Sequence, residues 1–488
     1  MSYDRDSRLA AACVMGSFDG TTVPRWLVER IAEGLGGVCL FAQNVIDDGQ
    51  VMAMCATMHT ARSGVVIAVD EEGGDVTRLD AADGSETPCP AAFGAVDDPE
   101  LTRRAFRSLG ARLARLGIDL SLAPCADINS NDRNPIIGVR SFGATAELAS
   151  RHTAACIAGF GEGGIGSCVK HFPGHGDTVA DTHLGAARVE ASLAQMEVRE
   201  LVPFRDAIAA GVDAVLTAHI IAPCLDDRPV SLSPRWTAYL RDELGYDGVV
   251  ITDALDMGAV AGDRGARGVA DAAVEALAAG ADLLCLGSNF DAEQTDLVVA
   301  TLADAIRAGR LDRTALGQSA ARVAKIRRHS SADGSAPAID ATAGAEVARR
   351  AIVVDGDIPA GLGTIVECRP QPSMASFNVT WGLARHLAAE GWQAHTVKSA
   401  PIDAAVIDTA AFDSGAVVIV VRDLDVHPWQ GDVIDRLAAT GRATVVVELG
   451  WPSSVRPAAD CYIITHGAAL ASTRAVADLL SQRVRGEL

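Results

Sequence analysis

The stretch VVITD (249–253) ends a short, mostly apolar run in an aspartate, and the same pattern recurs along the first two thirds of the chain. Continuous apolar runs, as opposed to alternating ones, are typical of parallel strands that are buried on both faces. Alanine-rich amphipathic segments lie between them. The eight predicted strands are ACVMG (12–16), GVCLF (37–41), VVIAV (65–69), LSLAP (120–124), SCVKHF (167–172), AVLTAH (214–219), VVITD (249–253) and LLCLG (283–287).

Strands that alternate with helices in this way favour an N-terminal (β/α)8 TIM-like barrel, with a doubly wound open sheet as the alternative. Two connecting helices are predicted over 99–117 and 191–211, the second with Ser192 as its N-cap and Gly211 after its last turn. Polar residues at the predicted strand ends favour the barrel, because there these ends converge on one mouth. The residues are Asp70, Asp127, Lys170, His171, His219 and Asp253.

Beyond the predicted barrel domain (1–328), the small, polar and proline-broken stretch 329–345 predicts a linker. The strand–helix alternation then resumes and predicts a smaller three-layer α/β domain over 346–488. This domain carries no recognisable catalytic motif, and its most functional-looking segment is the loop RDLDVHPWQ (422–430), with Asp425, His427 and Trp429. The predictions here are strands over 351–354, 364–368, 394–398, 416–421, 443–449 and 461–465, and a helix over 379–392.

The composition is that of a large folded protein: of 488 residues, 49% are hydrophobic and 22% charged, with a formal net charge of -21. Such a charge argues against a nucleic-acid or anionic-membrane partner. The sequence has no apolar run long enough to predict a membrane span and no apolar core of a signal peptide near its start. The 11 cysteines form no CxxC pair. We therefore expect buried, reduced thiols, Cys125 and Cys168 among them, in a cytoplasmic protein.

The loop KHFPGHGDTVADTH (170–183) concentrates histidines, aspartates and a lysine. Metal binding is one interpretation, because a catalytic zinc site uses three protein ligands. Such ligands are usually fixed in place by further residues on a rigid element. Proton transfer and anion binding are the others. The candidate metal ligands are His175, Asp177, Asp181 and His183, with His219 on a strand end.

This loop resembles the signature of glycoside hydrolase family 3, in particular its NagZ-like β-N-acetylglucosaminidase branch. Three further blocks match in the expected order: AVDEEGGDVTRL (68–79) resembles the family's sugar-binding strand end, RNPIIGVRSFG (133–143) its arginine loop and GVVITDALDMGAV (248–260) its nucleophile segment. Together the four blocks cover the predicted barrel. The resemblance implies a catalytic TIM-like barrel, a glycosidase activity and no cofactor.

Carried over position by position, the resemblance implies that Asp253 is the nucleophile that forms a covalent glycosyl-enzyme. It implies His183 as the general acid/base, oriented by Asp181. The sequence departs from many relatives at Asp75, where arginine is expected, and this bears on the outer subsite more than on the chemistry. The residues implied to hold the sugar are Asp70, Arg78, Arg140, Lys170 and His171.

The residue types themselves suit this chemistry. A retaining glycosidase needs a carboxylate that attacks the anomeric carbon and an acid that protonates the leaving oxygen. A histidine, with an ordinary pKa near 6.5, can donate and accept a proton near neutrality, and a neighbouring aspartate fixes its tautomer. We expect His175 and Asp177 to shape the loop and His219 to line the pocket; no metal is required.

The sequence therefore predicts a retaining exo-β-N-acetylglucosaminidase, a β-N-acetylhexosaminidase that acts in the cytoplasm on muropeptides from cell-wall recycling or on chitin oligosaccharides, with a homodimer as the default assembly. A β-N-acetylglucosaminide phosphorylase is an alternative, because a histidine does not repel an incoming phosphate as a carboxylate does. Two alternatives of another class are a metal-dependent hydrolase and a non-catalytic sugar-binding protein. The presence of Asp253, Asp181 and His183 argues against the last.

Overall fold

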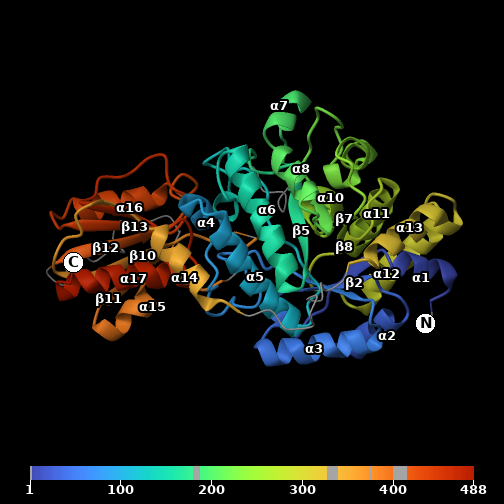
Figure 1. Cartoon of the computed structure of the whole chain (residues 1–488), viewed down its shortest axis with the longest axis horizontal. Coiled ribbons are helices and arrows are strands. Elements are labelled where there is room, and N and C mark those ends of the chain that lie inside the picture. The colour runs from blue at the N-terminus through green and yellow to red at the C-terminus, as the bar shows by residue number, and fades with distance from the viewer. Residues whose placement is uncertain are drawn as a thin grey trace.

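The computed structural model describes residues 3–179, 187–326, 339–373, 375–376, 379–398 and 415–487. These residues form two domains, each built around one sheet (Figure 1). The first is an 8-stranded sheet from the N-terminal part of the chain, and the second is a 6-stranded sheet from the remainder. The predicted barrel domain followed by a smaller α/β domain is confirmed.

The N-terminal sheet is a parallel barrel with the strand order β7-β6-β5-β4-β3-β2-β1-β8. Its end strands meet through a parallel bridge between Ile251 and Leu283, and the Thr252 N–H donates to the Leu283 carbonyl at 3.1 Å. Because the two ends are joined, the open-sheet alternative is wrong. The strands are β1 (Val14–Gly16), β2 (Gly37–Leu40), β3 (Val66–Val69), β4 (Leu120–Ser121), β5 (Gly166–Phe172), β6 (Ala214–Thr217), β7 (Val249–Thr252) and β8 (Leu284–Cys285).

Helices cover the outside of this barrel (Figure 1). α5 follows its prediction: the Asp98 side chain accepts from the Leu101 N–H at the start, and Gly117 ends the helix in the left-handed region at φ 89°. The helices are α1 (Arg5–Ala11), α2 (Arg25–Ala32), α3 (Asp48–Ala61), α4 (Pro90–Val96), α5 (Pro99–Leu116), α6 (Ala146–Gly163), α7 (Leu193–Val198), α8 (Val202–Ala209), α9 (Pro234–Ala238), α10 (Gly258–Ala261), α11 (Gly265–Ala278), α12 (Ala292–Arg307) and α13 (Arg313–Val323).

The single helix predicted over 191–211 is wrong in its middle, where the chain forms α7 and α8 instead. Ser192 does cap α7, as predicted. The break precedes Pro203, which lies in the first turn of α8. Proline has no N–H to donate and disfavours a helical conformation in the residue before it, so a helix restarts there more easily than it continues.

The barrel interior is packed with side chains from its strands, so it is a core and not a channel. One buried cluster holds Met15, Cys39, Ala68, Leu120, Cys168, Leu216, Ile251 and Cys285. All cysteines are unpaired and all but Cys224 are buried, as expected. Within the described ranges, none of the helices combines the length and the apolar composition that a membrane span requires.

The C-terminal sheet has the strand order β11-β10-β12-β13-β14-β9. Only the pairing of β14 with β9 is antiparallel among the described pairs. Helices lie on both faces: α15 and α17 pack on one, and α16 on the other (Figure 1). The three-layer prediction is confirmed. The elements are β9 (Val353–Gly356), β10 (Leu362–Arg369), β11 (Gln393–Lys398), β12 (Ala416–Val421), β13 (Thr444–Glu448), β14 (Cys461–Ile464), α15 (Ala384–Leu387), α16 (Trp429–Ala438) and α17 (Leu470–Arg485).

Two predictions about this part of the chain need correction. The helix expected over 379–392 is only the short α15, followed by a 3-10 turn (Ala388–Glu390). Of the linker expected over 329–345, residues 329–338 lie outside the described residues. Its last residues begin a helix, α14 (Ala341–Arg350), which Asp340 caps by accepting from the Thr342 N–H. α14 packs against α4 and α5 of the barrel and α17 of the second domain, so this segment joins the two domains by packing (Figure 1).

Candidate active site

The carboxyl ends of the barrel strands surround a cavity of about 150 Å³. Among its lining residues are most of those predicted to form the site: Asp70, Arg78, Arg140, Lys170, His171, His175 and Asp253. Ala375, which comes from the C-terminal domain, also lines the cavity. The mouth of the barrel is therefore closed in part by the second domain.

Two consecutive residues of β5, Lys170 and His171, both line this cavity. Side chains of a regular strand alternate between its two faces, so two neighbours cannot normally share one face. The pairing of β5 with β6 is irregular between Val169 and Phe172. Such a bulge locally re-aims side chains and is common beside active sites.

Lys170 holds together the two carboxylates that follow β3. Its Nζ lies 2.7 Å from Asp70 Oδ1 and 2.6 Å from Glu72 Oε1. Burial alone would lower the pKa of Lys170, but these two carboxylates raise it above its usual range. The ammonium group is therefore charged, and its direction is fixed by two ion pairs.

Glu72 is a residue of the site that the sequence analysis did not single out. Its side chain is 1% exposed and accepts from Arg140 Nε and Nη2 at 2.9 and 2.8 Å. Burial alone would raise the pKa of Glu72, but Arg140 and Lys170 lower it well below its usual range. One ionised carboxylate thus positions two of the predicted sugar-binding cations. The signal in the sequence was the acidic run 70–72 directly after a strand.

Arg78 connects the site to the second domain. Its Nη2 lies 3.4 Å from Asp70 Oδ2, and its Nη1 donates to the Ala375 carbonyl at 3.0 Å. Burial would raise the pKa of Asp70, but Lys170 and Arg78 lower it, so this carboxylate is ionised and accepts hydrogen bonds only. No sequence motif indicates the loop that carries Ala375.

Asp127, after β4, orients His171. Its Oδ2 lies 2.6 Å from His171 Nδ1, and its Oδ1 accepts from the His175 N–H at 2.6 Å. Burial would raise the pKa of Asp127, but His171 and His175 lower it to about 2. The other ring nitrogen of His171 lies 3.1 Å from Arg140 Nη2, which can only donate. His171 therefore carries its proton on Nδ1 and presents an accepting Nε2.

The three residues predicted to shape the loop or line the pocket, His175, Asp177 and His219, lie in different places. His175 lines the cavity, and burial lowers its pKa to about 4. Asp177 lies outside it and pairs with Arg199 at 2.7 Å. His219 is not among the lining residues, which corrects the prediction: its ring nitrogens contact Ser231 Oγ at 2.6 Å and the Ala254 carbonyl at 2.9 Å. It holds the backbone carbonyl of the residue that follows Asp253.

Asp253 follows β7 directly and lines the cavity, half-buried. Its N–H donates to the Thr217 carbonyl at 3.0 Å, and its Oδ1 accepts from the Ala254 N–H at 2.8 Å. A carboxylate fixed to the end of a buried strand is a rigid mount for a nucleophile. Asp181 and His183, the predicted acid/base pair, lie outside the described residues.

Potential metal ligands lie close together at one place in the described part of the chain, formed by Cys125, Asp127 and His171. Their atoms bind one another: Asp127 accepts from His171 and from the Cys125 thiol at 3.2 Å. Burial raises the pKa of the Cys125 thiol well above its usual range, so the thiolate that a metal prefers is disfavoured. These residues fit a hydrogen-bonded support for His171 better than a metal site.

Asp75, the position that departs from many relatives, points to the second domain. Its Oδ2 accepts from Arg422 Nη2 at 2.5 Å, and its Oδ1 accepts from the Ala468 N–H at 3.1 Å. The carboxylate of Asp75 therefore accepts from a side chain and from a backbone N–H of the second domain, and it takes part in the domain interface.

Residues 24–326, more than half of the chain, match the family described as glycosyl hydrolase family 3 N terminal domain. The chain belongs to glycoside hydrolase family 3. The family inferred from the four ordered motifs is confirmed.

Several known proteins are similar to this chain. The chain is 38% identical over 278 residues to Beta-hexosaminidase from Chromobacterium violaceum, covering 55% of this chain and 76% of that protein. It is 33% identical over 335 residues to Beta-hexosaminidase A from Pseudoalteromonas piscicida, covering 63% of this chain but only 56% of that relative. A solved structure of a family 3 β-N-acetylglucosaminidase from Paenibacillus sp. str. FPU-7 superposes with a TM-score of 0.86 at 29% identity, covering 99% of this chain and 97% of that one.

Proposed function

We propose that this protein is a retaining exo-β-N-acetylglucosaminidase that hydrolyses terminal β-linked N-acetylglucosamine through a covalent intermediate on Asp253. The observation that carries the proposal is the cavity at the barrel mouth. There Asp253 faces the same space as the network of Asp70, Glu72, Arg140 and Lys170. The names of the relatives support an N-acetylhexosamine as the sugar.

In this mechanism the ion-paired groups bind the hydroxyls of the terminal sugar. The ionised Asp70 accepts and Lys170 donates, each held in direction by the other. Asp253 attacks the anomeric carbon while the glycosidic oxygen leaves with a proton from His183, which Asp181 orients. A water molecule, deprotonated by His183, then releases the sugar from Asp253 with retained configuration.

The compartment and the natural substrate pool are part of the proposal. All cysteines of the chain are free thiols, which supports a reducing compartment such as the cytoplasm. The pool would be muropeptides from cell-wall recycling or short chitin oligosaccharides, both of which end in N-acetylglucosamine.

The test is turnover of an aryl β-N-acetylglucosaminide in phosphate-free buffer and again with millimolar phosphate, with the sugar product identified by mass. We expect free N-acetylglucosamine at equal rates in both. Asp253→Asn should lower kcat by at least about 10³-fold, because the bond-forming group is lost. The exposed Asp247→Asn, in the loop before β7, is the matched control. Formation of a sugar 1-phosphate at a phosphate-dependent rate, or full activity of Asp253→Asn, would contradict the proposal.

A further inference from the structure

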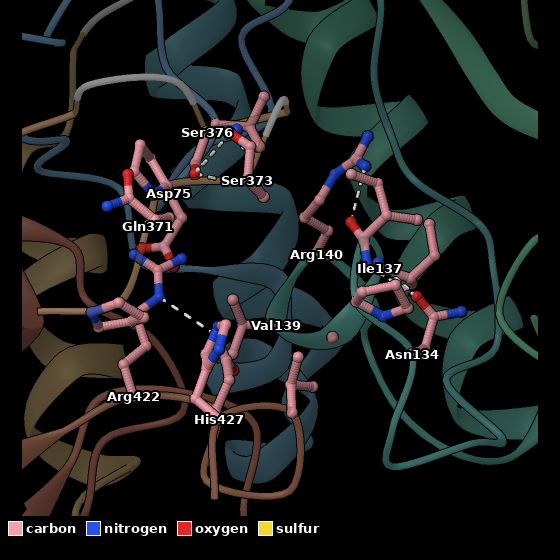
Figure 2. Close-up of a pocket in the computed structure, with 18 of the residues that line it drawn as sticks. Asp75, Asn134, Ile137, Val139, Arg140, Gln371, Ser373, Ser376, Arg422 and His427 are labelled. Carbon is pink, nitrogen blue, oxygen red and sulfur yellow. Dashed lines mark hydrogen bonds and ion pairs between the residues drawn. The ribbon is translucent and has the colours of Figure 1, made fainter. Parts of the chain in front are cut away.

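A second, larger pocket lies between the barrel and the C-terminal domain. It measures about 590 Å³ and lies between the barrel loop 134–140 and two segments of the second domain, 370–376 and 422–427. Figure 2 shows Asn134, Ile137 and Arg140 on one side of it and Gln371 and Arg422 on the other. The proposed mechanism does not assign it a role, and the family resemblance bears on it only through Asp75, which lines it.

We propose that this outer pocket is the aglycone subsite and that it selects an uncharged sugar ring, a second N-acetylhexosamine residue, over an acidic aglycone. The inference rests on the proposed function and adds the class of substrate to it. It also assigns a role in substrate binding to the second domain and to its loop 422–430, the segment that the sequence analysis singled out.

The outer pocket continues the inner cavity. Val76, Ile136, Ile137 and Arg140 line both, so one wall is shared. The inner cavity, at about 150 Å³, is small, whereas the outer pocket falls in the usual size range of ligand pockets, about 300–1,000 Å³. A terminal sugar held against Asp253 would therefore extend its glycosidic bond along the shared wall into the outer pocket.

The charges of the outer pocket are balanced within the protein. Arg422 is bound by Asp75 at 2.5 Å and by Asp423 at 3.3 Å, and Arg140 is bound by Glu72. Among the described residues that line the pocket, these two arginines are the only permanent cations. Burial lowers the pKa of His427, so this ring is neutral near pH 7. A carboxylate on the aglycone would lose its hydration in this pocket, while both lining cations are already paired with carboxylates of the protein. Binding of an acidic aglycone is therefore unfavourable.

The remaining surface suits a neutral sugar. Ile136, Val139 and Val426 provide apolar contacts for the faces of a ring. The side chains of Gln371 and His427 face the same pocket, and in the described structure neither makes a hydrogen bond to the protein. Their amide and imidazole groups remain available to hydroxyl and acetamido groups, as a few placed polar groups in an apolar pocket usually are.

The first experiment compares two disaccharides that differ by one group. N,N'-diacetylchitobiose is neutral, and N-acetylglucosaminyl-β-1,4-N-acetylmuramic acid adds a lactyl carboxylate to the second ring. We expect kcat/KM to be at least about ten-fold higher for the neutral disaccharide at pH 7, because the carboxylate is desolvated without a partner. Equal values, or a preference for the acidic disaccharide, would overturn the inference.

Variants of the second domain test the same point independently. Gln371→Ala and His427→Ala should each lower the ratio of kcat/KM for diacetylchitobiose to that for an activated aryl N-acetylglucosaminide by about five- to ten-fold, since each removes hydrogen bonds to the second ring. Gln482→Ala is the matched control, because Gln482 on α17 lines neither pocket. A ratio that does not change in either variant would place the aglycone elsewhere.

A third variant tests the charge argument by weakening the preference for a neutral aglycone. Asp423→Asn keeps the shape of the side chain and the acceptor for the Trp451 N–H, and asparagine tolerates the left-handed backbone at φ 53°. It leaves Arg422 with one carboxylate instead of two. The preference for the neutral over the acidic disaccharide should shrink several-fold, and an unchanged preference would count against the charge argument.

The two levels of proposal fail in different ways. If no N-acetylglucosaminide is hydrolysed, the proposed function is wrong and the aglycone inference is wrong with it. If the aryl glycoside is hydrolysed but the acidic disaccharide is used at least as well as the neutral one, only the aglycone inference is wrong.

Discussion

Replacing Glu72 by glutamine removes the carboxylate that Arg140 and Lys170 share, at 2.8 and 2.6 Å. The variant keeps the volume of the side chain but leaves two buried cations without their common partner. Removing one member of a buried ion pair costs about 3–5 kcal/mol of folding free energy. For a domain of this size, that loss lowers the melting temperature of the barrel by roughly 6–10 °C.

Activity should fall as well, because Arg140 and Lys170 are implied to hold the sugar. A displacement of such groups by about 1 Å can cost about 100-fold in rate, so we expect a fall of about that size in kcat/KM for an aryl N-acetylglucosaminide. Glu29→Gln is the matched control: it breaks the ion pair with Arg25, whose side chains are 94% and 51% exposed, and should cost less than about 1 kcal/mol. Thermal melting at pH 7 measures both variants. If Glu72→Gln melts within 2 °C of the parent protein and retains its kcat/KM, the network does not organise the site.

Three further outcomes follow from the buried carboxylates. Asp127→Asn should raise KM by about ten-fold with a smaller effect on kcat, because His171 loses the acceptor that fixes its tautomer. If Asp127 does not have that role, steady-state kinetics will show no change in KM. The pKa of Asp127 is about 2 in the folded state and lies near 3.9 when unfolded, so its stabilising effect of about 2–3 kcal/mol is present above pH 4 and is lost as the pH falls towards 2. Acid titrations of the unfolding free energy should be flatter by that amount in Asp127→Asn. Glu71 has the opposite effect, because burial and then Asp80 raise its pKa to about 7. Folding stability is therefore lost as the pH rises from about 4 to 7, and Glu71→Gln should remove about 3–4 kcal/mol of that decline. Parallel pH profiles of the unfolding free energy for the two proteins would refute this.

The strands of the barrel were predictable because each is an apolar run that is buried on both faces, and the polar residue after it marks its carboxyl end. Asp70 and Asp253, which directly follow β3 and β7, were placed at the cavity in this way. The helix over 191–211 was overextended because periodicity does not show that Pro203 restarts it. His219 was misplaced because its position beyond a strand end does not reveal that its ring turns to Ser231 and Ala254.

What the sequence could not show are contacts between residues far apart in the chain. Glu72 follows the same strand as Asp70, but its importance depends on Arg140 reaching it across the barrel mouth. Asp75 pairs with Arg422 across 347 residues of chain, and Arg78 contacts Ala375 across 297 residues. Both contacts join the two domains and have no local signal. The outer pocket is lined by residues of both domains, so it too has no local signal in the sequence.

The most direct test of the account is identification of the residue that carries the sugar during turnover. The enzyme would be reacted with an activated 5-fluoro β-N-acetylglucosaminyl fluoride, which forms a slowly hydrolysed intermediate, then digested and mapped by mass spectrometry. The proposed mechanism predicts a glycosylated peptide that contains Asp253 and a product released with retained configuration. An unlabelled protein that turns the substrate over with inversion, or a label on any other residue, would contradict it.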